Sequence, residues 1–305
     1  MKKTKNFNRE PKPRKDRFGT SIVTLRNQKK KGIKTVIVTA YTYPEAVLAD
    51  KAGVDIILVG DSLGMTTLGY KTTIAVTMDD MIAHCRGVWR ANQNAFQIGD
   101  MPFMSYQESN ELAIRNAGRF MKEGGCDAVK IEGAMIDRVK AIVDSGIVVM
   151  SHLGLTPQSR AALGGYRVQG KTMKAAEKIL EDALALQDAG CSFLLLEAVP
   201  REAAAIVSSE LEIPIYGVGA GDKVDGQLVI LHDLIGMFFE FKSKFVKRYC
   251  DAGEMILESL KDYAYEVRTE QFPSKENFYE MNENDLEKML VDPRWKYVID
   301  DQEKK

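Results

Sequence analysis

Five successive apolar runs of the sequence end in polar residues whose types could carry out acid–base or metal chemistry. These residues are Asp61, Asp100, Lys130 with Glu132, His152 and Glu197. Carboxylates bind cations and transfer protons, and a nearby ammonium or imidazole can bind an acidic substrate. Each acid alone has an ordinary structural interpretation, such as a helix N-cap, an Asx turn or an exposed strand end. The repetition of the pattern favours one shared site.

Lys130 and Glu132 are separated by one residue within an apolar run. On a β-strand, residues with this spacing point to the same face, while Val129 and Ile131 point to the other. If the apolar pair packs against helices, the ammonium and the carboxylate both face the opposite side. An ion pair that only closes the top of the fold is an alternative interpretation of the same spacing.

Three carboxylates that meet in a partly buried place repel one another, so Asp61, Asp100 and Glu132 predict a cation among them. The sequence has no His/Cys cluster with the spacing of metal ligands, and oxygen ligands favour Mg²⁺ or Mn²⁺ over Zn²⁺. Because Mg²⁺ usually keeps positions open for substrate oxygens, such a site could bind a chelating α-keto acid.

Glu197 is the candidate general base, because apolar residues precede and follow it and burial raises the proton affinity of a carboxylate. The alternative is a glutamate in a salt bridge at the rim of the fold. His152 and His84, as single histidines, are interpreted by default as hydrogen-bonded structural residues. His232 resembles a site residue more closely, because we expect it to end a strand.

Eight apolar runs alternate with amphipathic, helix-like stretches and must position these side chains. The runs are 34–40, 55–61, 95–100, 127–133, 146–154, 192–199, 213–221 and 227–233. Each is short, rich in aliphatic residues and closed by a polar residue or glycine, as buried parallel strands are. A doubly wound sheet is an alternative, but the even number of runs and the length of 305 residues favour a (β/α)8 TIM barrel. Ser62 is expected to cap the following helix while Asp61 binds the metal.

The two ends of the chain depart from this pattern. Residues 1–17 carry eight Lys or Arg and predict a flexible basic arm, whereas 18–268 form the barrel and 269–305 a charged C-terminal extension. A net charge of -1 gives no long-range attraction to nucleic acid or an anionic membrane. No apolar stretch is long enough for a signal peptide or a membrane span. Four widely spaced cysteines without a C-x-x-C predict reduced core thiols and a cytoplasmic protein.

The sequence resembles the 3-methyl-2-oxobutanoate (ketopantoate) hydroxymethyltransferase family over about residues 18–268. The resemblance rests on VTAYTYPEA, LVGDSLGM, VTMDDMIAHCRGV, DMPFMSY, VKIEG, SHLGLTPQS, GGYRVQG, LLLEAVP and IPIYGVGAG, among other segments. It implies a barrel of the phosphoenolpyruvate/pyruvate superfamily type, a Mg²⁺ ion and 5,10-methylenetetrahydrofolate as co-substrate. The implied reaction converts 3-methyl-2-oxobutanoate to 2-dehydropantoate through a Mg-stabilised enolate, in pantothenate and coenzyme A biosynthesis. A homo-oligomer, often a homodecamer, is also implied.

The resemblance also implies a role for each candidate residue. Asp61, Asp100 and Glu132 correspond to metal ligands, the last directly or through water, and Glu197 corresponds to the proton acceptor. Asp61, Ser62, Asp100, Lys130 and His152 correspond to substrate-binding residues. The chain departs from the family after LHDLIG, where it reads MFFEFKSKFVKRY.

Two alternative functions are also compatible with the sequence. The first is another Mg-dependent carbon–carbon lyase or mutase of the same superfamily, although those enzymes usually carry a cysteine-bearing loop where this chain has GGYRVQG. The second is a catalytically silent barrel that binds a keto acid. Such a protein would not need a base such as Glu197.

Overall fold

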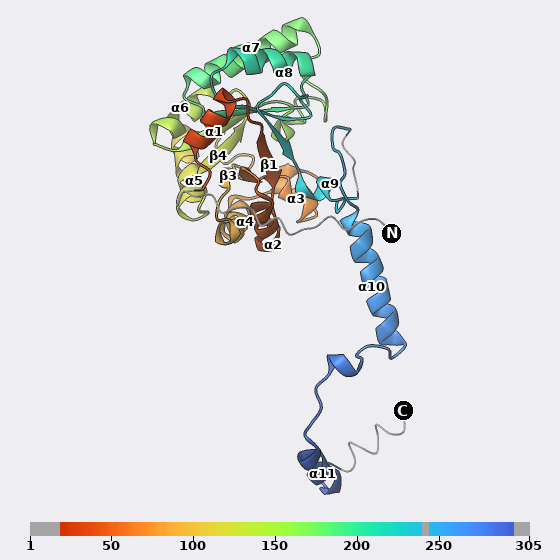
Figure 1. Ribbon diagram of the computed structural model, residues 1–305. Helices are drawn as coiled ribbons and strands as arrows, with labels where there is room; N and C mark the ends of the chain where they lie inside the picture. Colours follow the sequence, from red (N-terminus) through yellow and green to blue (C-terminus); the bar gives the residue numbers. More distant parts are fainter. Residues whose placement is uncertain (1–18, 240–243, 296–305) are drawn as a thin grey trace. The chain divides into compact units, whose positions relative to one another are not determined.

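A closed barrel of eight parallel strands is the central feature of the computed structural model, which describes residues 19–239 and 244–295 (Figure 1). The strands are β1 (Thr35–Thr39), β2 (Ile56–Val59), β3 (Phe96–Asp100), β4 (Ala128–Glu132), β5 (Val148–Gly154), β6 (Phe193–Glu197), β7 (Ile215–Val218) and β8 (Gly226–Val229). Neighbouring strands pair in chain order, and β1 pairs with β8, where Ile37 lies opposite Leu228. The predicted (β/α)8 barrel is therefore confirmed, and the doubly wound sheet is excluded.

The structure has helices before and between the strands. The longer ones between strands cover the outside of the barrel (Figure 1), whereas Leu25 of the first helix packs with residues inside the barrel. The helices are α1 (Ile22–Lys30), α2 (Tyr43–Ala52), α3 (Leu63–Thr66), α4 (Met78–Ala91), α5 (Asn110–Lys122), α6 (Ile136–Asp144), α7 (Met173–Asp188), α8 (Arg201–Glu210) and α9 (Leu231–Leu234), with 3-10 turns η1 (Thr73–Ala75) and η2 (Pro157–Ser159). Local sequence explains several helix starts. Thr42 and Thr77 form capping boxes with Glu45 and Asp80, and Pro157 is the first residue of η2.

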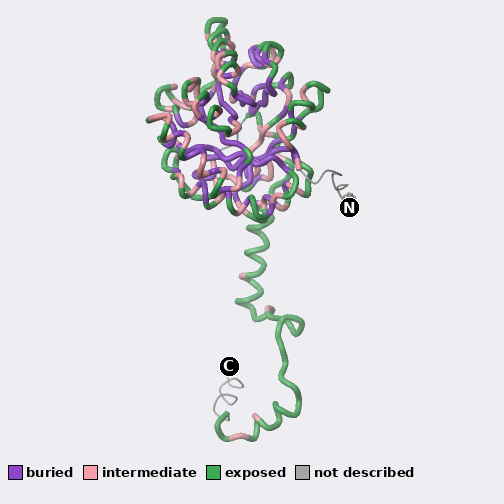
Figure 2. Tube along the Cα trace, turned by 90° about the vertical axis from the view of Figure 1, so that its left-hand side faces the viewer, coloured by how far each residue is buried: buried purple, intermediate pink, exposed green. Residues whose placement is uncertain are grey.

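The hydrophobic core has an outer and an inner layer, and buried residues gather in the barrel strands (Figure 2). In β4, Val129 and Ile131 belong to the outer layer, which fills the space between strands and helices. The inner layer includes Phe193, which contacts the rings of Phe96 and Tyr216. These aromatic side chains fill the barrel near the N-terminal halves of the strands, so the polar residues occupy the other end.

Two local expectations were wrong. The strand β8 ends at Val229, and His232 lies in the short helix α9 instead of ending a strand. Ser62 occupies the N-cap position of α3 but makes no capping hydrogen bond. Its backbone is already helical rather than extended, and its hydroxyl is 2.7 Å from the Tyr41 hydroxyl.

The chain divides into two units between Asp251 and Ala252. The second unit contains α10 (Ala252–Arg268), η3 (Lys275–Asn277) and α11 (Glu283–Val291). The barrel was expected to extend to residue 268, whereas the division places α10 in the second unit. The predicted basic arm, 1–17, lies outside the described residues.

No helix in the described part of the chain is both long and apolar enough to cross a membrane. All four cysteines are free, as expected. Cys85, Cys126 and Cys191 are buried, but Cys250 is exposed, so the expectation of a core position was wrong for that thiol.

Candidate active site

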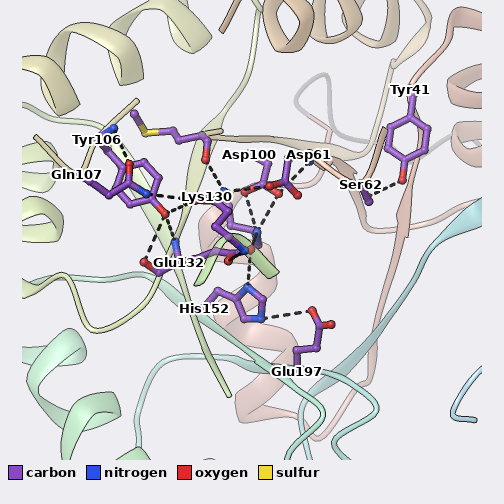
Figure 3. A network of polar contacts seen from close by, with 12 residues as sticks. Tyr41, Asp61, Ser62, Asp100, Tyr106, Gln107, Lys130, Glu132, His152 and Glu197 are labelled. Carbon is purple, nitrogen blue, oxygen red and sulfur yellow. Dashed lines mark hydrogen bonds and ion pairs between the residues drawn. The ribbon is translucent and has the colours of Figure 1, made fainter. Parts of the chain in front are cut away.

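The predicted site residues gather at the C-terminal ends of five neighbouring strands (Figure 3). Asp61 follows β2, Asp100 ends β3, Lys130 and Glu132 lie in β4, His152 lies in β5 and Glu197 ends β6. Parallel strands of a barrel bring their C-terminal ends to the same face. The register places Asp100 beside Lys130, and Glu132 beside His152. The structure therefore brings these six predicted residues together.

Lys130 lies at the centre of the buried charges. Its Nζ is 2.7 and 2.8 Å from the two carboxylate oxygens of Asp100 and 3.3 Å from Oε1 of Glu132. Burial alone would lower the pKa of Lys130, but the two carboxylates outweigh burial and raise it. The ammonium is therefore a fixed positive charge, and the predicted inward direction of Lys130 and Glu132 is confirmed.

Asp61 carries a carboxylate that the lysine does not contact directly. Its backbone N–H donates to Oδ2 of Asp100 at 3.1 Å, and its own Oδ2 accepts from Nε2 of Gln158 at 3.0 Å. Burial, followed by repulsion from Asp100 and Glu132, raises the pKa of Asp61 well above its ordinary value. The ionised form of Asp61 would be stabilised by a further cation.

The charges of this cluster fit a divalent cation. When all groups are ionised, three carboxylates and the Lys130 ammonium leave two unbalanced negative charges in a buried place. One divalent ion would balance them. Gly60 leaves room for the neighbouring Ser62 hydroxyl, because a Cβ at Gly60 would lie 2.9 Å from Oγ of Ser62.

The protein does not supply a complete metal cage. Within 19–239 and 244–295, no three His, Cys, Asp or Glu side chains are arranged as a ready metal-binding group. Both oxygens of Glu132 are engaged, Oε1 with Lys130 and Oε2 with the backbone N–H of Gln158. Mg²⁺ is commonly held by one or two carboxylates together with water and substrate oxygens. Asp61 and Asp100 fit that description, and contact through water fits Glu132.

His152 lies between the two glutamates of the site (Figure 3). Its Nδ1 is 3.4 Å from Oε1 of Glu132, and its Nε2 is 3.5 Å from Oε2 of Glu197. The side chain is 1% exposed, and its ring nitrogens make no hydrogen bond within the described residues. Burial alone would raise the pKa of Glu132, but Lys130 and His152 lower it to about 2. Glu132 is therefore an ionised partner for the histidine.

Glu197 has the acidity expected of a general base. Burial raises its pKa to about 7, against the opposing effect of His152. The side chain is 21% exposed, so the carboxylate is accessible as well as partly desolvated. Its backbone is held by Leu155, whose N–H donates to the Glu197 carbonyl at 2.8 Å. Gly154 permits this approach, because a Cβ there would lie 2.3 Å from the same carbonyl oxygen.

Three polar residues of the site were not predicted from the sequence. Tyr41 donates to or accepts from Ser62, and burial raises the pKa of Tyr41 to about 12, which keeps its hydroxyl neutral. The hydroxyl of Tyr106 donates to Oε1 of Gln158 at 2.7 Å and accepts from the backbone N–H of Glu132 at 3.0 Å. The third residue is Gln158. Tyr41, Tyr106 and Gln158 each follow shortly after a barrel strand, and this position is the one sequence signal that could have identified them.

The other two histidines, His84 and His232, lie near Tyr41 and outside the cluster of Asp61, Asp100 and Glu132. Nδ1 of His84 is 2.6 Å from the Tyr41 carbonyl, which can only accept, so the structural interpretation of His84 is confirmed. His232 stacks on the Tyr41 ring, and its Nε2 is 3.4 Å from Oε1 of Glu45.

Comparisons with known proteins identify relatives of this chain. A family model described as ketopantoate hydroxymethyltransferase matches residues 20–275. The chain is 48% identical over 271 residues to 3-methyl-2-oxobutanoate hydroxymethyltransferase of Syntrophomonas wolfei. This match covers 88% of this chain and 98% of that protein. It is 49% identical over 265 residues to the protein of the same name from Moorella thermoacetica, with coverage of 86% and 98%.

A solved structure of 2,3-dimethylmalate lyase, described as a member of the PEP mutase/isocitrate lyase superfamily, matches with a TM-score of 0.54. The match covers 93% of this chain and 99% of that chain at 16% identity. At this identity the likeness concerns the fold alone. It agrees with the closed barrel of eight parallel strands that the strand pairing shows.

Proposed function

The chain belongs to the ketopantoate hydroxymethyltransferase family, and we propose that it uses a divalent metal and 5,10-methylenetetrahydrofolate to convert 3-methyl-2-oxobutanoate to 2-dehydropantoate. One observation carries the proposal. Glu197, whose pKa is raised to about 7, shares a barrel mouth with an acid cluster that has the charge to hold a divalent cation. The pair matches a reaction that must remove a proton beside a ketone.

Asp61 and Asp100 would hold one Mg²⁺, with Glu132 in contact through water. When bound, the ion would polarise the keto oxygen and stabilise the negative charge that develops on it. Lys130 contributes a fixed positive charge that attracts the substrate carboxylate. Ser62, whose hydroxyl is oriented by Tyr41, would donate to the same carboxylate. His152, whose Nε2 is 3.5 Å from Oε2 of Glu197, would give the substrate a further polar contact.

Glu197 would accept the proton from C3 of the keto acid, and the electron pair of that C–H bond would be shared with the keto oxygen. The nucleophilic carbon then forms a bond to the one-carbon unit of the folate. Overall, two C–N bonds of the folate are exchanged for one C–C bond and one C–O bond, and water supplies the product hydroxyl. The C3 proton and one proton of water end on the two folate nitrogens.

A proton-exchange experiment tests the proposal. We expect 3-methyl-2-oxobutanoate to exchange its C3 proton in deuterated water when wild-type protein and Mg²⁺ are present, even without folate, as followed by NMR. Adding the folate should then yield 2-dehydropantoate. Exchange without condensation would instead favour another enolate reaction of the superfamily. If no exchange occurs, the protein is better described as a silent keto-acid-binding barrel.

The exchange rate should depend on pH through the ionisation of Glu197. A base must be unprotonated, and its pKa is raised to about 7, so the rate should rise with pH and level off above that value. Below it the rate should fall about tenfold for each pH unit. NMR exchange rates from about pH 5 to about pH 9, at saturating Mg²⁺, measure this profile. A rate that is flat across the range would contradict the assignment.

Substitution of Tyr41 by phenylalanine should weaken substrate binding. The change removes the hydroxyl that lies 2.7 Å from Ser62, and a hydrogen bond of this kind is worth about 0.5–1.5 kcal/mol net. We expect KM for the keto acid to rise about two- to tenfold, with a smaller change in kcat. Tyr43→Phe, on the exposed side of α2, is the matched control. Equal KM values for the two variants would argue against a role for Tyr41.

We further propose that the protein is a homo-oligomer, with ten subunits as the family resemblance implies. Large apolar side chains along α10 support a contact with other subunits, because they are exposed: Met255, Ile256, Leu260, Tyr263 and Val267. A light-scattering mass near that of one chain would contradict this proposal. The free buried thiols support a location in the cytoplasm.

A further inference from the structure

Gln158 is a buried amide that connects the acids of β2 and β4. The residue lies in η2, directly after β5, and is 3% exposed. Its Nε2 donates to Oδ2 of Asp61 and to the Met101 carbonyl, each at 3.0 Å. Its backbone N–H donates to Oε2 of Glu132, also at 3.0 Å. One residue therefore contacts both carboxylates, through separate groups.

The orientation of the Gln158 amide is determined by its neighbours. The Met101 carbonyl can only accept a hydrogen bond, so the NH₂ group must face it, and the same group then faces Asp61. On the other side, Oε1 accepts from the Tyr106 hydroxyl at 2.7 Å and from Nε2 of Gln107 at 3.3 Å. A flipped amide would place two acceptors against each other at Met101. The donor to Asp61 is therefore held in place from both ends.

The backbone contact of Gln158 with Glu132 does not depend on its side chain, whereas its contact with Asp61 does. At the start of a helical turn the first N–H groups lack partners within the turn, so the N–H of Gln158 is available to Glu132 whatever side chain follows. Only the side chain reaches Asp61. A substitution at residue 158 can therefore remove the contact with Asp61 while the contact with Glu132 remains.

We propose that Gln158 is a positioning residue that holds the Asp61 carboxylate in the orientation required to bind the metal. The inference rests on the metal-dependent part of the proposed function. A carboxylate that must bind a cation loses less rotational freedom when one oxygen is already fixed by a donor. The bond from Nε2 fixes Oδ2 of Asp61, and Tyr106 fixes the amide that supplies it.

Metal binding, measured without substrate turnover, tests the proposal. Mn²⁺ serves as the probe for a Mg²⁺ site, and the loss of its free EPR signal on titration gives Kd. Gln158→Met keeps the approximate size of the side chain but removes the amide, and we expect Kd to rise about 10- to 100-fold. Gln107→Met makes the same chemical change in a residue that contacts Gln158 but neither carboxylate. It should raise Kd far less than Gln158→Met does, because the shorter bond from Tyr106 still holds the Gln158 amide.

Tyr106→Phe provides a second variant that removes only one oxygen atom, in case Gln158→Met does not fold. It takes away the hydroxyl that orients the Gln158 amide and should also raise Kd, by less than Gln158→Met does. Thermal melting without metal separates loss of stability from loss of affinity. The inference is overturned if Gln158→Met binds Mn²⁺ like the wild type, or if Tyr106→Phe does so when Gln158→Met does not fold. It is also overturned if Gln107→Met raises Kd as much as Gln158→Met does. If the wild type itself does not bind Mn²⁺, with or without keto acid, the metal part of the proposed function fails first.

Discussion

Replacement of Glu197 by glutamine should reduce exchange of the C3 proton of 3-methyl-2-oxobutanoate by about 10²- to 10⁴-fold. Glutamine has nearly the same shape but cannot accept the proton. The neighbouring charges and the backbone contact from Leu155 to residue 197 remain in place. Binding of the keto acid and of the metal should therefore change much less than the exchange rate. The defect should be visible both in NMR exchange and in formation of 2-dehydropantoate.

The matched control for this experiment is Glu202→Gln, in the first turn of α8. It makes the same chemical change a short distance along the chain, at an exposed position outside the site. We expect the control to exchange the C3 proton at the wild-type rate. If Glu197→Gln does so too, Glu197 is not the base, and the role must pass to another group in the barrel mouth.

Replacement of Lys130 by methionine should have the largest effect on stability. The ammonium is the direct partner of both Asp100 and Glu132, and all three side chains are at most 4% exposed. Removing one member of a buried ion pair leaves an uncompensated charge and lowers the free energy of unfolding by about 3–5 kcal/mol. The carboxylates then become harder to ionise, so the loss should be larger at pH 8 than near pH 5.

Urea unfolding at the two pH values measures this loss. Lys140→Met removes a lysine from an exposed pair with Asp144 on α6, where the side chains are 66% and 61% exposed. Such surface pairs contribute about 0–1 kcal/mol, so the control should unfold almost like the wild type. Equal stability of the Lys130 and Lys140 variants would mean that the buried cluster is already neutral in the folded protein.

The barrel and most of its acids could be predicted because they follow simple rules. Aliphatic runs closed by a polar residue indicate buried parallel strands, and parallel strands bring their ends to one face. These rules directly predict that Asp61, Asp100 and Glu197 lie at the same end of the barrel. The inward direction of Lys130 and Glu132 follows from the two-residue period of a strand.

Other parts of the site depend on the path of loops, which no periodicity describes. Glutamine and tyrosine are common in loops, so Gln158 and Tyr106 could not be distinguished from solvated residues before the loops were placed. The apolar run that contains β8 continues without a break into α9, and the sequence therefore did not show that His232 leaves the strand. The Ser62 hydroxyl pairs with the Tyr41 hydroxyl and does not cap α3, and nothing in the sequence indicated that these two residues are neighbours.

The division of the chain was equally hard to see in advance. The helix α10 alternates apolar and charged residues in the same way as the helices that cover the barrel. Periodicity indicates that a helix has an apolar face but does not identify the surface against which that face packs. For this reason α10 was counted among the helices of the barrel, and residue 268, the expected end of the barrel, is the last residue of α10.

The pairing of β1 with β8 has a consequence for how the protein folds. Contacts in the site join distant parts of the chain, such as Gln158 and Asp61, which are 97 residues apart. The acids of neighbouring strands meet when those strands pair, but the whole cluster needs β2 to β6 in place, and we expect it to lose most of its hydration when the ring of strands closes. The electrostatic penalty is thus concentrated late in folding, when many native contacts already exist to offset it.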